Sequence, residues 1–156
     1  MPTIAISIDS VLPAQRVLAL AVDFSEQRSR VFPAVEVEHL GVHSLDDAGA
    51  DVTEGTGTGI GVNWERCRYE WSTSGAVTAT VKDSNVYAAG SKWELRAEPT
   101  DSGSHVAMTW VRRFRRSPRG MLFGTAFRLI GRPMFQRYAR QIVTNMEAVE
   151  AKSCSA

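Results

Sequence analysis

The two ways in which apolar residues are spaced along this chain constrain its fold most strongly. From residue 34 to residue 114 they recur mainly at every second position, which is typical of β-strands, and from Gly120 to Ala151 they recur at every third or fourth, which is typical of helices. Short turn clusters separate the strand-like runs. Because parallel strands require long crossovers, these turns predict an antiparallel meander and then a long helix. The clearest strand-like runs are residues 62–72, 76–82, 87–98 and 105–114.

The first thirty residues add one strand and a pair of short helices. Alternating isoleucines predict a strand over Thr3–Asp9. Pro13 suits the first turn of a helix, where its missing N–H costs nothing, and an apolar stripe continues from there to Phe24. The polar stretch Ser25–Arg30 is expected to form a second short helix or a turn.

Residues 34–60 predict a less regular part of the sheet. Val35 and Val37 alternate with glutamates, and the pattern then changes phase, as a bulge near His39 would produce. Asp46–Gly49 is a turn cluster. The glycine-rich residues 51–60 are expected to form a weak or strongly curved strand.

One motif interrupts the helical stretch near the C-terminus. Proline within a helix removes a backbone hydrogen bond and clashes with the preceding turn. Gly131-Arg132-Pro133 is therefore expected to break or kink the helix, with a first segment near residues 121–130 and the main helix starting at Pro133.

Length and composition fit one soluble domain over residues 1–156. The chain has 44% apolar and 22% charged residues, typical of a globular protein. Cys67 and Cys154 are too few for a disulfide scaffold and are expected to be free thiols in a reducing compartment. The predicted class is α+β: a curved antiparallel sheet of about six or seven strands wrapped around a long C-terminal helix, with two short helices after the first strand.

Several short motifs resemble the SRPBCC or START-like superfamily, and within it the polyketide cyclase/dehydrase group. Residues 13–23 with Phe32-Pro33 resemble its first helix, Trp64-Glu65-Arg66 a strand opening, residues 104–111 the last strand, and Pro133–Ala151 the closing helix. The resemblance implies a helix-grip fold with a cavity between sheet and helix. Members carry lipids, sterols or quinones, and some cyclise aromatic polyketides, so the resemblance implies a pocket for a hydrophobic molecule rather than one reaction.

The residues expected to line this cavity come from the strands and the last helix. Trp93 and Leu95 share one strand face, and Met108 and Trp110 share another. If these faces point inward, they form aromatic walls that suit flat apolar ligands, whereas the alternative is an ordinary core. The expected ligand-binding residues are Trp64, Trp71, Trp93, Leu95, Met108, Trp110, Phe127, Phe135, Tyr138, Ile142 and Met146.

The run of residues 62–72 is unusual because neither of its faces is apolar. Trp64, Arg66, Arg68 and Glu70 alternate with Glu65, Cys67, Tyr69 and Trp71. Whichever face points inward brings polar groups that must be paired or must serve a ligand. Arg66 could polarise a carbonyl, or Tyr69 could donate a proton beside Glu65, so these three are the catalytic candidates of a cyclase/dehydrase. The alternative is a set of cross-strand ion pairs facing solvent.

Positive charge is concentrated near the C-terminus. Residues 102–146 contain nine arginines and no acidic residue, although the net charge of the chain is +1. Arginines mixed with exposed apolar residues over 112–132 predict contact with an anionic membrane surface, which makes a non-catalytic lipid or quinone carrier the alternative function. A solvated helix face is the plainer interpretation, and a protein-interaction module ranks lower. The arginines concerned are Arg112, Arg113, Arg115, Arg116 and Arg119.

Other partners and cofactors find little support. His39 and His43 are too far apart in a strand to share a metal, and residues 55–61 lack the Lys-Ser or Lys-Thr of a phosphate-binding loop. We therefore expect no metal and no cofactor. No stacking motif accompanies the arginines, so nucleic acid is not expected. The chain is expected to be a cytoplasmic or peripheral membrane protein, as a monomer or homodimer.

Overall fold

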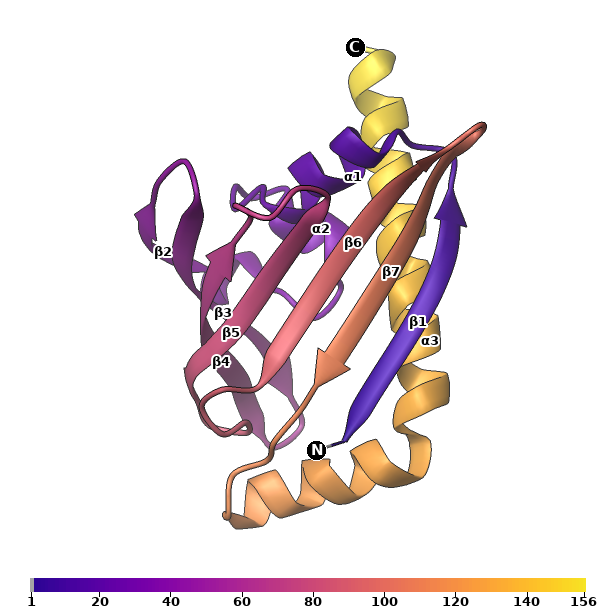
Figure 1. Ribbon diagram of the computed structural model, residues 1–156. Helices are drawn as coiled ribbons and strands as arrows, with labels where there is room; N and C mark the ends of the chain where they lie inside the picture. Colours follow the sequence, from indigo (N-terminus) through magenta and orange to yellow (C-terminus); the bar gives the residue numbers. More distant parts are fainter. Residues whose placement is uncertain (1) are drawn as a thin grey trace.

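A seven-stranded antiparallel sheet organises the molecule, in the strand order β1-β7-β6-β5-β4-β3-β2 (Figure 1). The computed structural model describes residues 2–156. Strands β2 to β7 follow one another as a meander, and β1 closes the opposite edge by pairing with β7, as the short turns predicted. The strands are β1 Thr3–Ser10, β2 Gly41–Leu45, β3 Gly49–Thr58, β4 Gly61–Glu70, β5 Ala76–Ser84, β6 Lys92–Thr100 and β7 Gly103–Val111.

Local sequence signals fix where the helices begin. The helices are α1 Ala14–Ala21, α2 Arg28–Val31, a short 3-10 helix η1 at Val37–His39, and α3 Pro118–Cys154. Pro13 precedes the first turn of α1, as expected. At the start of α3, the Ser117 hydroxyl accepts a hydrogen bond from the Gly120 N–H at 3.1 Å, and Pro118 follows directly.

The helix α3 is bent rather than interrupted. The chain stays helical through Pro133, so of the two expected outcomes the helix kinks and does not break. Figure 1 shows the first part of α3 crossing the base of the sheet and the second part rising beside β7 and β1. A Cβ at Gly131 would lie 3.0 Å from the Ile4 side chain, so a glycine there allows the helix to approach β1 closely. No helix within residues 2–156 is both long and apolar enough to span a membrane.

The prediction of a strand from Ala34 is wrong. Residues 37–39 form η1 instead, the strand β2 starts only at Gly41, and the register shift lies between Val42 and Ser44 rather than near His39. The Glu36 carboxylate explains this, because it accepts a hydrogen bond from the Gly57 N–H at 3.1 Å while its own N–H donates to the Gly55 carbonyl. These bonds hold a turn against β3 where alternation alone indicated a strand.

The residues preceding β6 also differ from the prediction. Tyr87 was expected inside this strand, but β6 begins at Lys92 and Tyr87 forms only an isolated bridge with Phe114. The Ser84 hydroxyl accepts from the N–H groups of Val86 and Tyr87, so the backbone turns away from the sheet there.

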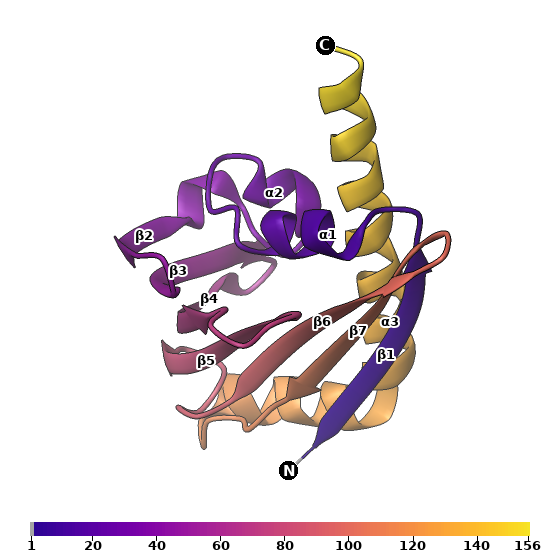
Figure 2. The same ribbon diagram turned by 45° about the horizontal axis from the view of Figure 1, so that its top comes forward.

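The concave face of the sheet carries the core. Trp93, Leu95, Met108 and Trp110 are all buried, which confirms that their strand faces point inward. Helix α1 packs against β5, β6 and β7, whereas α2 packs against α3, and Figure 2 shows the sheet curving beneath these helices. The inner face of the sheet, α2 and the second part of α3 therefore surround one interior space.

Candidate ligand-binding cavity

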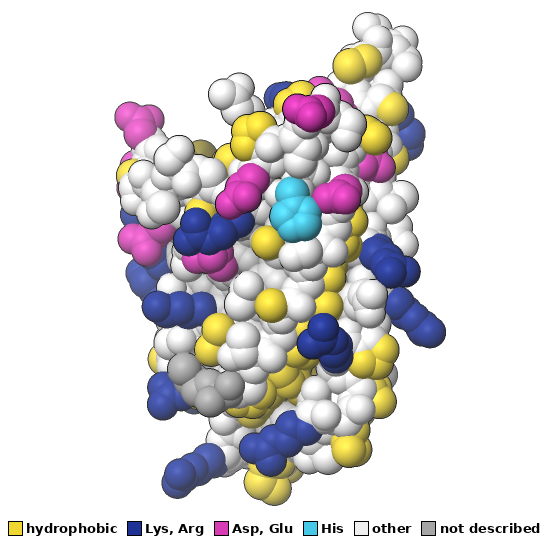
Figure 3. Space-filling view, turned by 45° about the vertical axis from the view of Figure 1, so that its right-hand side comes forward, with side chains coloured by type: hydrophobic (Ala, Val, Ile, Leu, Met, Phe, Trp, Pro, Cys, Tyr) yellow, Lys and Arg dark blue, Asp and Glu magenta, His cyan; other side chains and the backbone are white. Residues whose placement is uncertain are grey.

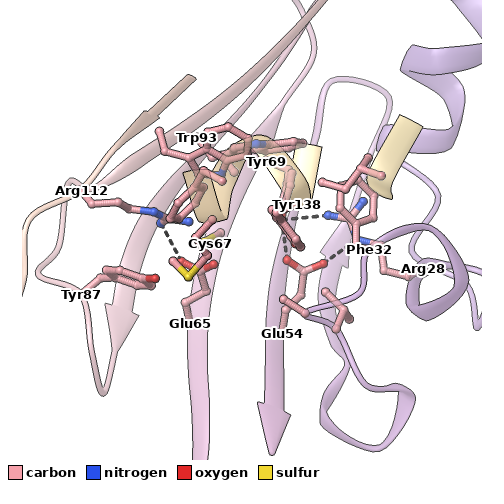
Figure 4. Close-up of a pocket in the computed structure, with 17 residues that line it drawn as sticks. Arg28, Phe32, Glu54, Glu65, Cys67, Tyr69, Tyr87, Trp93, Arg112 and Tyr138 are labelled. Carbon is pink, nitrogen blue, oxygen red and sulfur yellow. Dashed lines mark hydrogen bonds and ion pairs between the residues drawn. The ribbon is translucent and has the colours of Figure 1, made fainter. Parts of the chain in front are cut away.

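A cavity of about 270 Å³ lies between the inner face of the sheet and the helices α2 and α3. Strand alternation supplies its floor, because every second residue of β4 points to the same side. Figure 4 shows the residues that surround it. They are Arg28, Phe32, Ala34, Val35, Glu54, Glu65, Cys67, Tyr69, Ala79, Tyr87, Trp93, Trp110, Arg112, Met134, Phe135, Tyr138 and Ile142.

Aromatic rings form much of the wall. Trp93 and Trp110 are register partners in the β6–β7 pair and lie side by side on its inner face, and Phe135 of α3 stands edge-on to Trp110, with 4.8 Å between ring centroids. Tyr69 lies 6.3 Å from Trp93 in a similar edge-on contact. Rings packed edge to face hold each other in place, so the cavity has a defined shape suited to flat apolar molecules.

A buried polar cluster lies at one end of the cavity. The Arg28 Nε donates to Glu54 Oε1 at 2.6 Å, and the Tyr69 hydroxyl donates to Glu54 Oε2 at 2.5 Å. The Arg28 guanidinium also lies over the Phe32 ring, 3.9 Å from its centroid. Both Glu54 oxygens therefore have donors, as a buried carboxylate requires.

The protonation states of this cluster follow from its burial. Burial alone would lower the pKa of Arg28, but the attraction and hydrogen bond of Glu54 outweigh this, so its pKa lies above the ordinary value. Burial raises the pKa of Tyr69 well above its usual range, and the nearby Glu54 acts in the same direction. The arginine is thus charged and the tyrosine keeps its proton across the physiological range.

A second, partly buried polar cluster lies at the other end (Figure 4). Arg112, which follows β7, donates from Nη1 to Glu65 Oε2 at 3.0 Å, and its guanidinium lies over the Tyr87 ring at 4.2 Å from the centroid. Cys67 is next to Glu65 on the inward face of β4, and burial together with Glu65 raises the pKa of its thiol. The thiol therefore stays protonated and unreactive near neutral pH.

The cavity opens to solvent where α3 approaches the segment after α2. Ala34 and Met134 both line the cavity, yet both are exposed on the surface, Met134 to 46%. The other wall residues of this part, Val35 and Phe135, are buried. A molecule entering from solvent would thus pass between Ala34 and Met134.

The structure places seven of the predicted site residues around the cavity. They are Glu65, Tyr69, Trp93, Trp110, Phe135, Tyr138 and Ile142. Four others are buried in the surrounding core without lining the cavity: Leu95, Met108, Phe127 and Met146. Trp64 and Trp71 are only partly buried, and the Trp71 indole N–H donates to the Asp47 carbonyl at 2.8 Å. Roles for the lining residues in binding or catalysis stay predictions.

Arg66 does not reach the cavity. It lies on the outer face of β4, because the more apolar side with Cys67 and Tyr69 turns inward and alternation places Arg66 opposite. Its Nε donates to Asp51 at 2.7 Å, and Lys82 donates to the same carboxylate at 2.8 Å. These two donors lower the pKa of Asp51 to about 2. Arg66 thus belongs to a cross-strand ion pair, the alternative interpretation of this strand.

The arginines of the basic segment 112–132 also lie in different environments. Arg112 is buried and cannot face a membrane, because it continues the inward parity of Met108 and Trp110. Arg115 pairs with Asp83, and Arg119 donates to the Ile60 and Val62 carbonyls at the β3–β4 turn. Of the five arginines named from the sequence, Arg113 and Arg116 remain exposed without such roles among residues 2–156.

Sequence reasoning missed Arg28 and Glu54. A signal existed for Glu54, because Ala50 and Val52 share its strand face and are apolar, so the glutamate interrupts an inward-facing row. No comparable signal marks Arg28, which lies in a short polar stretch whose helix α2 has only four residues. Its burial depends on contacts from β3 and β4 that are distant in sequence.

One surface group could offer ligand atoms to a metal. Glu36, Glu38 and His39 bring oxygen and nitrogen atoms within 4.8 Å of one another. The Glu36 carboxylate already accepts from Gly57 and lies 3.5 Å from the His39 Nε2. The closeness of these three side chains therefore follows from the η1 turn itself. His43 instead contacts Thr53, away from this group.

Solved structures share this fold at low sequence identity. A protein from Thermus thermophilus is 14% identical with a TM-score of 0.75, covering 95% of this chain and 99% of that one. The Zhui aromatase/cyclase from a Streptomyces species is 11% identical, with a TM-score of 0.74 and coverage of 94% and 93%. A START superfamily protein from Mycobacterium smegmatis is 7% identical, with a TM-score of 0.72 and coverage of 94% and 98%.

These comparisons establish the architecture. No protein-family model and no curated protein matches the sequence. The chain has the helix-grip fold of the START-like and aromatase/cyclase structures, as the sequence resemblance implied. At such identities the likeness shows the fold alone, so function has to be argued from the cavity.

The buried cluster around Glu54 predicts a distinctive pattern of stability. Arg28→Leu should lower the free energy of unfolding by about 3–5 kcal/mol, because it leaves the Glu54 carboxylate buried and unpaired. Removing the whole cluster, with Arg28→Leu, Glu54→Leu and Tyr69→Phe together, should recover much of this loss. Urea denaturation measures both.

The control for this experiment is Arg66→Leu, which should change stability far less, because Arg66 is itself largely exposed and its partner Asp51 keeps the Lys82 ammonium at 2.8 Å. A triple variant no more stable than Arg28→Leu alone would contradict a dominant cost of the unpaired carboxylate.

Proposed function

We propose that this chain, which has the fold of START superfamily and aromatase/cyclase structures, binds a compact hydrophobic small molecule in the cavity beneath α3. The supporting observation is an aromatic-walled space that opens to solvent between Ala34 and Met134. An ordinary core would be closed and filled, because protein interiors pack as tightly as organic crystals. An open, ring-lined hollow is the usual form of a small-molecule site.

The size of the cavity narrows the ligand class. Its volume of about 270 Å³ exceeds the roughly 150 Å³ that encloses benzene and lies just below the roughly 300–1,000 Å³ of drug-sized sites. A molecule of one or two rings, such as a quinone-like or small aromatic polyketide-like compound, fits this space better than a long acyl chain. The flat walls of Trp93 and Trp110 favour the same class.

Blocking the entrance tests this proposal. Ala34→Trp places a large ring at the exposed mouth and should weaken binding of 2-ethylnaphthalene by about tenfold or more, since it occupies the path rather than the core. Isothermal titration calorimetry measures the affinity. Ala5→Trp, at an exposed position of β1, is the matched control and should bind as the unaltered chain does. Equal affinity in both variants would place binding elsewhere.

Cyclisation of a poly-β-keto chain is the enzymatic form of this proposal. It is supported by the Glu65 carboxylate in the cavity and by the likeness to an aromatase/cyclase. In this form Glu65 removes a proton from a carbon between two carbonyl groups, and that carbon bonds to a ketone carbon of the same chain. The ketone oxygen takes up a proton in return, and because the Tyr69 hydroxyl already donates to Glu54, the proton that Glu65 removed is the one given back.

Substitution of the candidate base separates enzyme from carrier. Glu65→Gln should lower the rate of cyclisation of a linear 3,5,7-trioxo thioester, in which C2 bonds to the C7 ketone carbon, by about 10²- to 10⁴-fold, the usual contribution of a general base. The rate is followed by the absorbance of the cyclised product. Glu70→Gln, on the exposed outer face of the same strand, should leave the rate unchanged. If the unaltered chain is no faster than buffer, the cavity binds without catalysing this reaction.

Exchange of the ligand with an anionic bilayer is the second candidate function. The supporting observation is an exposed apolar surface on the first part of α3, formed by Met121, Leu122, Leu129, Ile130 and Met134. In the view of Figure 3, lysine or arginine side chains and apolar side chains lie over the lower half of the molecule, and the acidic side chains lie in its upper half. Met134 also lines the cavity, so this surface reaches the mouth. Apolar side chains flanked by arginines suit an anionic lipid surface.

Vesicle binding tests this second function. Leu129→Glu should weaken binding to phosphatidylcholine–phosphatidylglycerol vesicles by about tenfold, because a residue exposed to 77% loses its burial in lipid and gains a repelled charge. Leu45→Glu is the matched control, since Leu45 is 63% exposed on the distant β2 edge. Co-sedimentation in low and high salt measures both. Equal loss in the two variants, or no binding by the unaltered chain, would exclude a lipid-binding role for α3.

A further inference from the structure

The two buried arginines of the cavity differ in how completely their N–H groups are paired. In Arg28 all three nitrogens donate: Nε to Glu54 at 2.6 Å, Nη1 to the Ala21 carbonyl at 2.6 Å and Nη2 to the Tyr69 hydroxyl at 3.0 Å. Each nitrogen of this guanidinium thus has a partner in the protein, so it has less to offer a ligand than an arginine with an unpaired nitrogen.

Arg112 is buried to a similar degree but is far less completely paired. Only its Nη1 donates to another side chain, Glu65, although a guanidinium carries five N–H donors. Among residues 2–156, its Nε is one of two buried side-chain nitrogen or oxygen atoms without a hydrogen-bond partner. The other, Asn63 Oδ1, belongs to a residue that does not line the cavity. No hydrogen bond of its Nη2 is found within residues 2–156 either, so Arg112 brings unused donors to the end of the cavity that it lines.

The fold holds Arg112 in this position rather than leaving it free to move away. Its guanidinium is stacked over the Tyr87 ring and bonded to Glu65, and its backbone N–H donates to the Pro2 carbonyl at 3.0 Å. Its side chain is only 8% exposed. An unpaired donor at such a site is unfavourable unless an acceptor reaches it, and in a low-dielectric interior a charged donor binds an acceptor strongly.

We propose that the ligand of this cavity carries a carbonyl or carboxylate oxygen that accepts hydrogen bonds from the Arg112 guanidinium, while its apolar body lies against Trp93 and Trp110. Figure 4 shows Arg112 and Arg28 at opposite sides of the drawn residues. Because every nitrogen of Arg28 already donates to the protein, the polar group of the ligand lies at the Arg112 end. This inference rests on the proposed function and narrows its ligand to ring compounds with one terminal acceptor group.

Three probes of nearly equal shape test this inference. 2-Acetylnaphthalene, 2-naphthoate and 2-ethylnaphthalene share a ring system, and the first differs from the last by a carbonyl in place of a methylene. The unaltered chain should bind the two oxygen-bearing probes about 10- to 100-fold more tightly than 2-ethylnaphthalene, as expected for a hydrogen bond to a charged group. Isothermal titration calorimetry gives the three affinities.

A spectroscopic measurement locates the acceptor group of the ligand in the unaltered chain. The Arg112 Nε–H resonance, assigned by its absence in Arg112→Lys, should move downfield with 2-acetylnaphthalene and stay in place with 2-ethylnaphthalene. In Arg112→Lys the preference for the oxygen-bearing probes should largely disappear, because an ammonium lacks the planar donor fork. Arg113→Lys, at the exposed neighbouring position, is the matched control and should keep the preference.

The outcomes separate this inference from the function on which it rests. Equal affinities for all three probes, with no shift of the Arg112 resonance, would overturn the inference while leaving hydrophobic binding in place. If none of the probes binds, the proposed function fails and the inference fails with it. If the preference for oxygen-bearing probes persists in Arg112→Lys, another residue donates to the ligand oxygen, and the role proposed for Arg112 is overturned.

Discussion

Two carboxylates on the inner face of the sheet, one buried and one partly buried, are the constraint that the rest of the cavity has to satisfy. Glu54 of β3 and Glu65 of β4 both point inward, where an unpaired charge would cost several kcal/mol (~3–5). Each is matched by an arginine from outside its own strand pair, Arg28 from α2 and Arg112 from the end of β7. The two charge pairs tie α2 and the β7–α3 connection to the middle of the sheet, so the cavity ends are fixed by electrostatics and its walls by aromatic packing.

This arrangement explains why the cavity is not simply filled. In each cluster an arginine and a glutamate neutralise each other and are held at hydrogen-bond distance. Each guanidinium also lies over an aromatic ring, that of Phe32 in one cluster and that of Tyr87 in the other. Side chains committed to such contacts cannot relax into the space between them. Apolar groups alone could have packed more closely, since cores tolerate extensive repacking when volume is conserved. Fixed polar clusters thus favour a permanent hollow between Arg28 and Arg112.

The fold could be predicted from the sequence wherever the apolar residues of a segment followed a single spacing, either that of a strand or that of a helix. The inward parity of Trp93 and Leu95 and the helical period after Gly120 each reflect local geometry, which a single segment records by itself. The strand expected from Ala34 failed because Glu36 bonds to the backbone of a strand twenty residues away. Long-range bonds of this kind leave no periodic trace.

The site was predictable only in part, for the same reason. The polar strand β4 was recognised as unusual, but which of its faces turned inward depended on β3 and β5, so Arg66 and Tyr69 could not be distinguished. Arg112 looked like one member of a basic cluster, although its even spacing after Met108 and Trp110 marked it as inward-facing. The alternation of residues along a strand therefore predicts whether a side chain points inward better than the charge of the surrounding segment does. An arginine that continues an apolar row is placed by backbone geometry in the interior, and there its charge requires a partner that a solvated arginine does not need.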